Sequence, residues 1–118
     1  MDLRIDEVKG HGDASEERVL LTVLNDCNLQ YYMISDCTYS GSKISNKHRH
    51  SKWFSSLEVK SGDRVVLYTR VGKTNKTVSD SGVTWHKIFW NLKTPVWNDD
   101  GDGAILIRIR SWDTTSVK

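Results

Sequence analysis

The stretch that decides the fold runs from Trp97 to Arg110 and reads WNDDGDGAILIRIR. A tryptophan leads into a turn crowded with Asn, Asp and Gly, and an apolar run follows at once. Glycine tolerates a positive φ angle, and Asn and Asp side chains bond their own backbone, so this composition indicates a turn that enters a β-strand. A shorter version of the pattern, SGDRVVLY, occupies Ser61 to Tyr68. Both stretches therefore predict strands that begin directly after a Gly-Asp turn.

The alternation in the last strand predicts which of its side chains are buried. Successive side chains of a strand point to opposite faces. Three isoleucines are therefore expected to face the core, and the arginines between and after them to face water; the isoleucines are Ile105, Ile107 and Ile109, and the arginines Arg108 and Arg110. Asp102, directly before Gly103, is expected to brace the turn by accepting hydrogen bonds from backbone amides.

Further apolar runs of strand length lie along the rest of the chain. They cover residues 3–5, 18–24, 29–34, 64–70 and 83–90, and the polar stretches 10–17, 38–51 and 71–82 separate them. Short strands divided by turn clusters, with no helical pattern between them, favour an all-β fold, an antiparallel β-sandwich. Residues 1–118 are expected to form one such domain, with Val19, Leu21 (or its neighbour Leu20), Ile34, Val65 and Leu67 in its core.

Composition excludes several classes of protein. With 37% hydrophobic and 27% charged residues, the chain of 118 residues is ordinary globular material. No apolar run approaches the ~18 residues of a membrane span, and the acidic start lacks the apolar core of a secretory signal. We therefore expect a cytoplasmic protein with no membrane partner. In that compartment Cys27 and Cys37 are expected to be reduced thiols, and one disulfide is the alternative.

The net charge of +2 conceals an uneven distribution along the chain. Residues 1–36 hold eight acidic and three basic side chains, whereas residues 37–93 hold eleven Lys or Arg and three acids. The densest acid-free stretch carries Lys43, Lys47, His48, Arg49, His50 and Lys52, and Trp53 follows directly. Cations attract phosphates and an adjacent aromatic ring can stack on a base, so this segment is a candidate polyanion site. The alternative is a solvated loop beside a core strand.

A second candidate surface lies on the strand predicted at 83–90. Trp85 and Phe89 fall on one face of this strand, and Ile88 and Trp90 fall on the other. Both faces are therefore apolar. Either the strand is central and covered on both sides, or Trp85 and Phe89 form a contact surface for another molecule.

Two patterns imitate metal sites. Asn98, Asp100 and Asp102 repeat like the start of a calcium loop, but the twelfth position, which requires a bidentate Glu, is Ile109. His48 and His50 lie on one face of an extended segment, but the cations Lys47, Arg49 and Lys52 surround them and repel a divalent ion. No acid, base and nucleophile converge in the sequence. We expect no cofactor, no metal and no enzymatic activity.

Three blocks of sequence are similar to one known family. They are Glu17 to Leu21 with LQYYMISD at 29–36, then Phe54, Leu57 and Val59 ahead of GDRVVL at 62–67, and finally WNDDGDGAIL at 97–106. In this order they resemble the lamin tail domain, with Tyr32 standing where the family usually has Trp. The resemblance implies an immunoglobulin-like β-sandwich that binds or attaches and has no catalytic residues. In lamins its partners include DNA and chromatin proteins, and in bacteria the module often accompanies hydrolases or nucleases.

Together these features predict a non-catalytic interaction module that mediates protein–protein attachment. The alternative is a small nucleic-acid-binding protein that uses the basic segment 43–52. The predicted binding residues are Lys43, Lys47, His48, Arg49, His50, Lys52, Trp53, Trp85 and Phe89.

Overall fold

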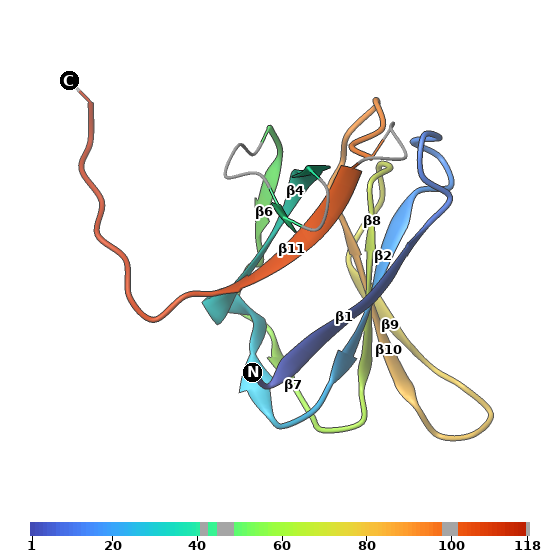
Figure 1. Cartoon of the computed structure of the whole chain (residues 1–118). Coiled ribbons are helices and arrows are strands. Elements are labelled where there is room, and N and C mark those ends of the chain that lie inside the picture. The colour runs from blue at the N-terminus through green and yellow to red at the C-terminus, as the bar shows by residue number, and fades with distance from the viewer. Residues whose placement is uncertain (41–42, 45–48, 98–101, 118) are drawn as a thin grey trace.

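The computed structural model describes residues 1–40, 43–44, 49–97 and 102–117, with the backbone alone at 39–40 and 43–44. The regular secondary structure of the described residues is almost entirely β-strand (Figure 1). They are β1 (Leu3–Lys9), β2 (Arg18–Val23), β3 (Cys27–Asn28), β4 (Tyr32–Ser40), β5 (Lys43–Ile44), β6 (Ser51–Trp53), β7 (Glu58–Val59), β8 (Arg64–Tyr68), β9 (Asn75–Val78), β10 (Thr84–Phe89) and β11 (Asp102–Arg108). The predicted all-β class is confirmed.

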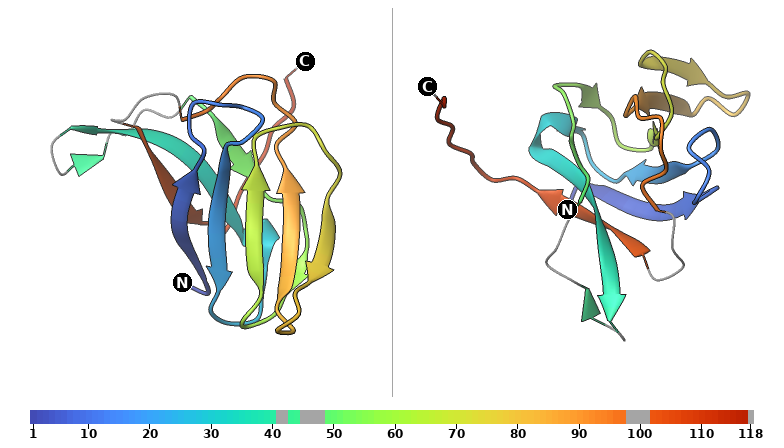
Figure 2. Two further views of the ribbon diagram at one scale, coloured as in Figure 1. Left: turned by 90° about the vertical axis from the view of Figure 1, so that its right-hand side faces the viewer. Right: turned by 90° about the horizontal axis from the view of Figure 1, so that it is seen from above.

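Two main sheets form two layers (Figure 2). One sheet has the strand order β1-β2-β8-β10-β9. In the other, β4 pairs with β11, β5 and β6. A short ribbon of β3 and β7 lies beside them. Predicted stretches 18–24, 64–70 and 83–90 thus become β2, β8 and β10.

The prediction of purely antiparallel pairing is wrong at one place, because β8 and β10 are parallel. The stretch 71–82, expected to be only a loop, contains the polar strand β9. After β8 the chain passes over one strand position, forms β9 at the sheet edge and turns back. The next strand, β10, therefore inserts between β8 and β9 and runs in the direction of β8. Similarly, the expected loop 38–51 contains the end of β4 and the short strand β5.

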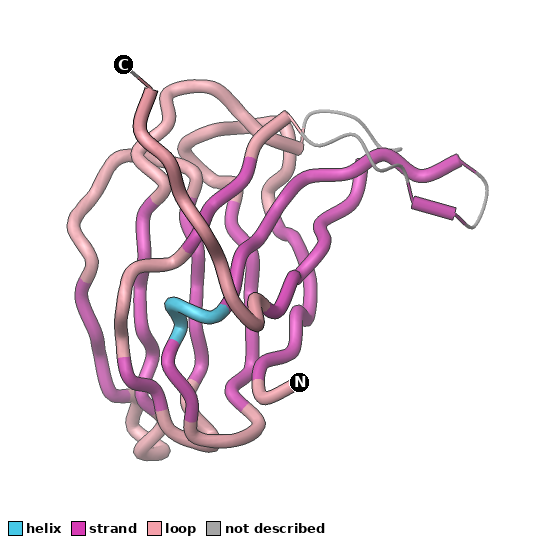
Figure 3. Tube along the Cα trace, turned by 90° about the vertical axis from the view of Figure 1, so that its left-hand side faces the viewer, coloured by secondary structure: helices cyan, strands magenta, loops and turns pink. Residues whose placement is uncertain are grey.

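The prediction for segment 29–31 is also wrong. It was expected to be part of a strand, but Leu29–Tyr31 form one turn of 3-10 helix (Figure 3). The Asn28 side chain caps this turn by accepting a hydrogen bond from the Gln30 backbone N–H. The turn buries Leu29 in the core and leaves Tyr31 on the surface.

The hydrophobic core lies between the two main sheets. Val19, Leu21, Ile34, Val65 and Leu67 are all fully buried there, as predicted. In β2 these side chains alternate with half-buried neighbours. In β8 the neighbouring Val66 is also buried, and in β4 so is Ser35, next to Ile34.

The predicted orientation of the last strand is wrong. Ala104 and Leu106 pack against the core, whereas Ile105 and Ile107 pair with Ser35 and Met33 on the other face of the sheet. Ile109 lies beyond the end of β11 and is half-buried. Both alternate sets of this strand are apolar, so period-two alternation by itself does not fix the face that is buried.

A buried carboxylate fastens the segment before β11 to the first sheet. Glu17 is fully buried, and its Oε1 accepts hydrogen bonds from Thr69 Oγ1 at 2.7 Å and from the Val96 backbone N–H at 2.7 Å. Its Oε2 accepts from the backbone N–H groups of Trp97 at 3.0 Å and Gly12 at 3.1 Å. One side chain therefore accepts from four donors, three of them more than 50 positions away in the sequence. Buried polar groups need hydrogen-bond partners, and here the four hydrogen bonds hold together the segment before β2, the segment after β8 and the segment before β11.

Candidate functional site

The basic segment predicted as a binding site is only partly described. Lys47 and His48 lie outside the described residues, as does the side chain of Lys43. Of the rest, the backbone N–H groups of Arg49 and His50 both donate to Asp36 Oδ1 at 2.9 Å. The His50 Nδ1 atom lies 3.3 Å from Asp36 Oδ2. The described part of this segment is therefore anchored by the buried carboxylate of Asp36.

The end of the basic segment continues as strand β6. Lys52 is half-buried and pairs with Ile34 of β4, while Trp53 pairs with Met33 and is 43% exposed. Phe54, the next residue, is buried in the core. Of the two aromatic residues, Trp53 thus stays accessible on the surface.

The Trp85 and Phe89 surface lies on the outer face of the five-stranded sheet. The register of the strands aligns the outward side chains of this sheet in three rows, and Trp85 and Phe89 of β10 each belong to one of them. The rows are Lys9, Arg18, Tyr68 and Phe89; Glu7, Leu20, Val66 and Lys87; and Arg4, Thr22, Arg64 and Trp85. Trp85 and Phe89 are half-buried, so the strand is not covered by another layer of the described chain.

Arginines lie against the aromatic rings of this face. The Tyr68 and Phe89 rings stack with centroids 5.0 Å apart, and the Arg70 guanidinium lies 4.8 Å from the Tyr68 centroid and 5.7 Å from that of Phe89. Arg64 lies 4.8 Å from the Trp85 centroid. Cation–π contacts of this kind hold a planar guanidinium in place with its edge available to a further partner.

Cations outnumber acids on the outer face. Two acids lie there: Glu7, whose carboxylate is 3.7 Å from Lys9 Nζ, and Asp6, which pairs with Arg4 at 2.8 Å and Arg64 at 3.4 Å. Burial raises the pKa of Asp6, but hydrogen bonds from Thr22 and Arg4 and the two arginine charges outweigh it, so its pKa lies below the ordinary value. On this face, three cations make no ion pair with any described residue: Arg18, Arg70 and Lys87.

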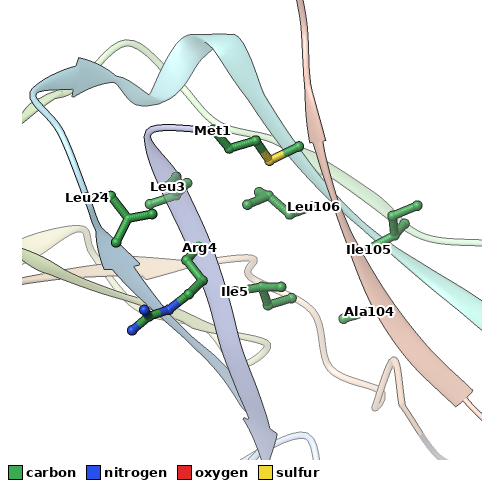
Figure 4. Close-up of a pocket in the computed structure, with 8 residues that line it drawn as sticks. All are labelled: Met1, Leu3, Arg4, Ile5, Leu24, Ala104, Ile105 and Leu106. Carbon is green, nitrogen blue, oxygen red and sulfur yellow. The ribbon is translucent and has the colours of Figure 1, made fainter.

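A separate hollow opens between the edge strands of the two sheets. It measures about 450 Å³ and is lined by Met1, Leu3, Arg4, Ile5, Leu24, Ala104, Ile105 and Leu106 (Figure 4). Ile5 of β1 and Leu106 of β11 point toward one another across it. Its one charged lining residue, Arg4, is already paired with Asp6. The hollow therefore offers aliphatic surface and no converging polar groups, in contrast to a typical catalytic pocket.

Three residues of the two metal-like patterns, His48, Asn98 and Asp100, lie outside the described residues. Within the described ranges no three His, Cys, Asp or Glu side chains are grouped so that they could hold an ion. His86 is buried with its Nε2 atom 2.8 Å from Asp63 Oδ2, which makes it a core residue. The turn 98–101 lies outside the described residues, so the bracing role of Asp102 stays a prediction.

Cys27 and Cys37 are both free thiols. Burial raises the pKa of each, and the nearby carboxylates of Asp2 and Asp36 raise it further at Cys27 and Cys37 respectively. A raised pKa keeps a thiol protonated and weakly nucleophilic.

Sequence reasoning missed a group of exposed aromatic rings at another place. Trp53 lies beside Trp112 with ring centroids 5.0 Å apart, and Tyr31 lies beside Trp112 at 6.2 Å. The three residues are far apart in the sequence, so no local pattern joins them. The available signal was the count of five tryptophans, of which the structure buries Trp97 alone.

Among the described residues, no helix has the length and apolarity that a membrane crossing needs. No protein-family model, no curated protein and no solved structure matches this chain.

Proposed function

We propose that this protein is a non-catalytic interaction module that attaches to an acidic protein partner through the outer face of its five-stranded sheet. The observation that carries the proposal is the set of guanidinium groups held over aromatic rings: Arg64 over Trp85, and Arg70 over Tyr68 and Phe89. Aromatic residues and arginine are the side chains that most often anchor protein interfaces.

The chemistry of this face indicates the chemistry of its partner. Arg18, Arg70 and Lys87 have no ion-pair partner among the described residues, so an acidic surface gains charge pairs there without breaking existing ones. Tyr68, Trp85 and Phe89 supply apolar contact area between the charges. A partner that presents carboxylates around apolar side chains complements both features.

We further propose that the module is an immunoglobulin-like sandwich of the lamin-tail type. Two of the three blocks that carry this resemblance meet in the structure, since the Glu17 carboxylate accepts hydrogen bonds from the backbone at Val96 and Trp97. The resemblance supports a binding role, because the family module carries no catalytic residues. The free thiols of Cys27 and Cys37 are compatible with the reducing compartment in which we expect the protein.

The test compares three forms of the protein as bait in an extract of the cells that express it. They are the wild type, the double variant Arg70→Glu/Lys87→Glu on the outer face, and the control Lys73→Glu/Lys76→Glu at exposed positions before and within β9. Both variants change the net charge from +2 to −2, since each replaces two cations by two acids. Nonspecific charge effects are therefore equal in the two variants.

We expect one acidic protein to be recovered with the wild type and the control but not with Arg70→Glu/Lys87→Glu. Once purified, that protein should bind the outer-face variant at least about tenfold more weakly than the control, a loss of roughly 1.4 kcal/mol. Equal recovery with both variants, or equal affinity for them, would show that the outer face is not the contact.

A further inference from the structure

Three aromatic side chains form an exposed cluster on the side of the molecule opposite the proposed partner face. Tyr31 follows β3, Trp53 ends β6 and Trp112 follows β11, and their exposed fractions are 42%, 43% and 50%. Trp53 belongs to the outer face of the second sheet, since it pairs with Met33 rather than lining the core. Large aromatic rings that gather on a surface and stay half-exposed indicate a contact site.

The backbone holds two members of this cluster in place. The Trp53 indole N–H donates to the Gln30 carbonyl at 2.7 Å, and the Ile109 backbone N–H donates to the Tyr31 carbonyl at 2.7 Å. The next residue, Tyr32, and Leu29 at the start of the same 3-10 turn are both buried. A ligand that meets Tyr31 and Trp53 thus finds rings that are already ordered, which lowers the entropic cost of binding.

A hollow of about 500 Å³ adjoins the cluster and is lined by Tyr31, Arg108, Ile109 and Arg110. Its lining contains no acidic side chain. Neither Arg108 nor Arg110 makes an ion pair with a described residue. Arg108 and Arg110 therefore line a ligand-sized space together with Tyr31, which also belongs to the aromatic cluster. A guanidinium matches the geometry of a phosphate group.

We propose that Tyr31, Trp53, Trp112, Arg108 and Arg110 form a binding site for a nucleotide unit, with the base on the rings and the phosphate on the arginines. An aliphatic acid engages only the arginines, and a neutral planar ring engages only the aromatic residues. A nucleotide uses both halves of the site, and its size suits a hollow of this volume. The same unit is supplied by a free nucleotide or by a single-stranded oligonucleotide.

The test follows the indole N–H signals of the full chain by NMR while 5′-AMP, adenosine or ribose 5-phosphate is added. We expect 5′-AMP to shift the signals of Trp53 and Trp112 and to leave that of Trp85 unchanged. The affinity for 5′-AMP should exceed that for either fragment roughly tenfold, because only the nucleotide meets both halves of the site. A short oligothymidylate identifies the source, since tighter binding of it than of thymidine 5′-monophosphate indicates a single strand and equal binding indicates the free nucleotide.

Variants separate the two halves of the site. Arg108→Ala/Arg110→Ala should weaken 5′-AMP about tenfold or more and leave adenosine within about twofold, whereas Trp112→Ala should weaken both. These positions are exposed, so folding is expected to be unaffected, and Arg70→Ala on the other sheet is the control. Indole shifts confined to Trp85, equal affinities for 5′-AMP and ribose 5-phosphate, or tighter binding of O-phosphotyrosine than of any nucleotide would each overturn the proposal. Because this site and the partner face share no residue, either can fail without the other.

Discussion

Replacement of Glu17 by Gln tests whether a buried carboxylate fastens the segment before β11. The change keeps the shape of the side chain and one acceptor oxygen, but it introduces an NH₂ group among N–H donors. If the amide nitrogen takes the position of Oε2, it faces the N–H groups of Gly12 and Trp97 and both hydrogen bonds are lost. If it takes the position of Oε1, the Thr69 hydroxyl can turn to accept from it, and only the Val96 N–H is left unsatisfied. The second orientation is therefore favoured.

The magnitude follows from that orientation. One buried backbone N–H without a partner costs about 1–3 kcal/mol, and the hydrogen bonds that remain lose the strengthening that a charged acceptor gives. We expect Glu17→Gln to lower the free energy of unfolding by about 2–4 kcal/mol. For a domain of this size one kcal/mol corresponds to roughly 4 °C in Tm, so Tm should fall by about 8–16 °C.

Urea unfolding followed by tryptophan fluorescence measures the free energy, and calorimetry measures Tm. The matched control is Glu16→Gln, the same chemical change at an exposed neighbouring position, which should stay within about 0.5 kcal/mol of the wild type. If Glu17→Gln were no more destabilising than Glu16→Gln, the account of Glu17 as the fastening point would be wrong.

Three further predictions concern the thiols, one glycine and one surface carboxylate. Cys27 and Cys37 should react with iodoacetamide much more slowly in the folded than in the urea-unfolded protein at pH 8, because their raised pKa values keep them protonated there; equal rates would contradict this. Gly72→Ala should destabilise the protein by roughly 1–3 kcal/mol and disturb the stack of Phe89 on its neighbour, because the new Cβ would lie 2.4 Å from the Phe89 ring; an unchanged Tm and near-ultraviolet circular dichroism spectrum would refute the packing. Asp6→Asn should cost less than about 1 kcal/mol at neutral pH, since the ion pairs lie at the surface. That difference should shrink below about pH 4, where unfolded Asp protonates, and vanish as pH falls through the lowered pKa of folded Asp6; a difference that persists at pH 2 would contradict it.

Much of the first sheet could be predicted from local pattern. Strands β2, β8 and β10 carry apolar side chains at alternate positions, and turn residues bound them. Strand β9 could not be found in this way, because Asn75–Val78 is an exposed edge strand with no apolar face. The parallel pairing of β8 with β10 depends on that missed strand.

Other features depend on contacts between residues far apart in the chain. The orientation of β11 was predicted wrongly because both alternate sets, Ala104 with Leu106 and Ile105 with Ile107, are apolar. The burial of Glu17 depends on Val96 and Trp97, which lie 79 and 80 positions further along the chain. No local period reports such a pairing.

The candidate surfaces also combine features that local pattern predicts with features that only the three-dimensional arrangement creates. Alternation within β10 placed Trp85 and Phe89 on one face of the strand, but it left open whether another layer covers that face. The arginines that lie over them come from β8 and the residues after it, so only the sheet topology places them there. The cluster of Tyr31, Trp53 and Trp112 likewise arises only when three separate segments are brought together.

The indole N–H spectrum of the protein in complex with its purified acidic partner tests the central claim most directly. Trp85 reports on the proposed partner face, Trp53 and Trp112 report on the opposite side, and Trp97 is buried in the core. We predict that the partner shifts or broadens the Trp85 signal and leaves those of Trp53 and Trp112 unchanged. Perturbation of Trp53 and Trp112 with an unchanged Trp85 signal would contradict the assignment of the five-stranded sheet as the attachment surface.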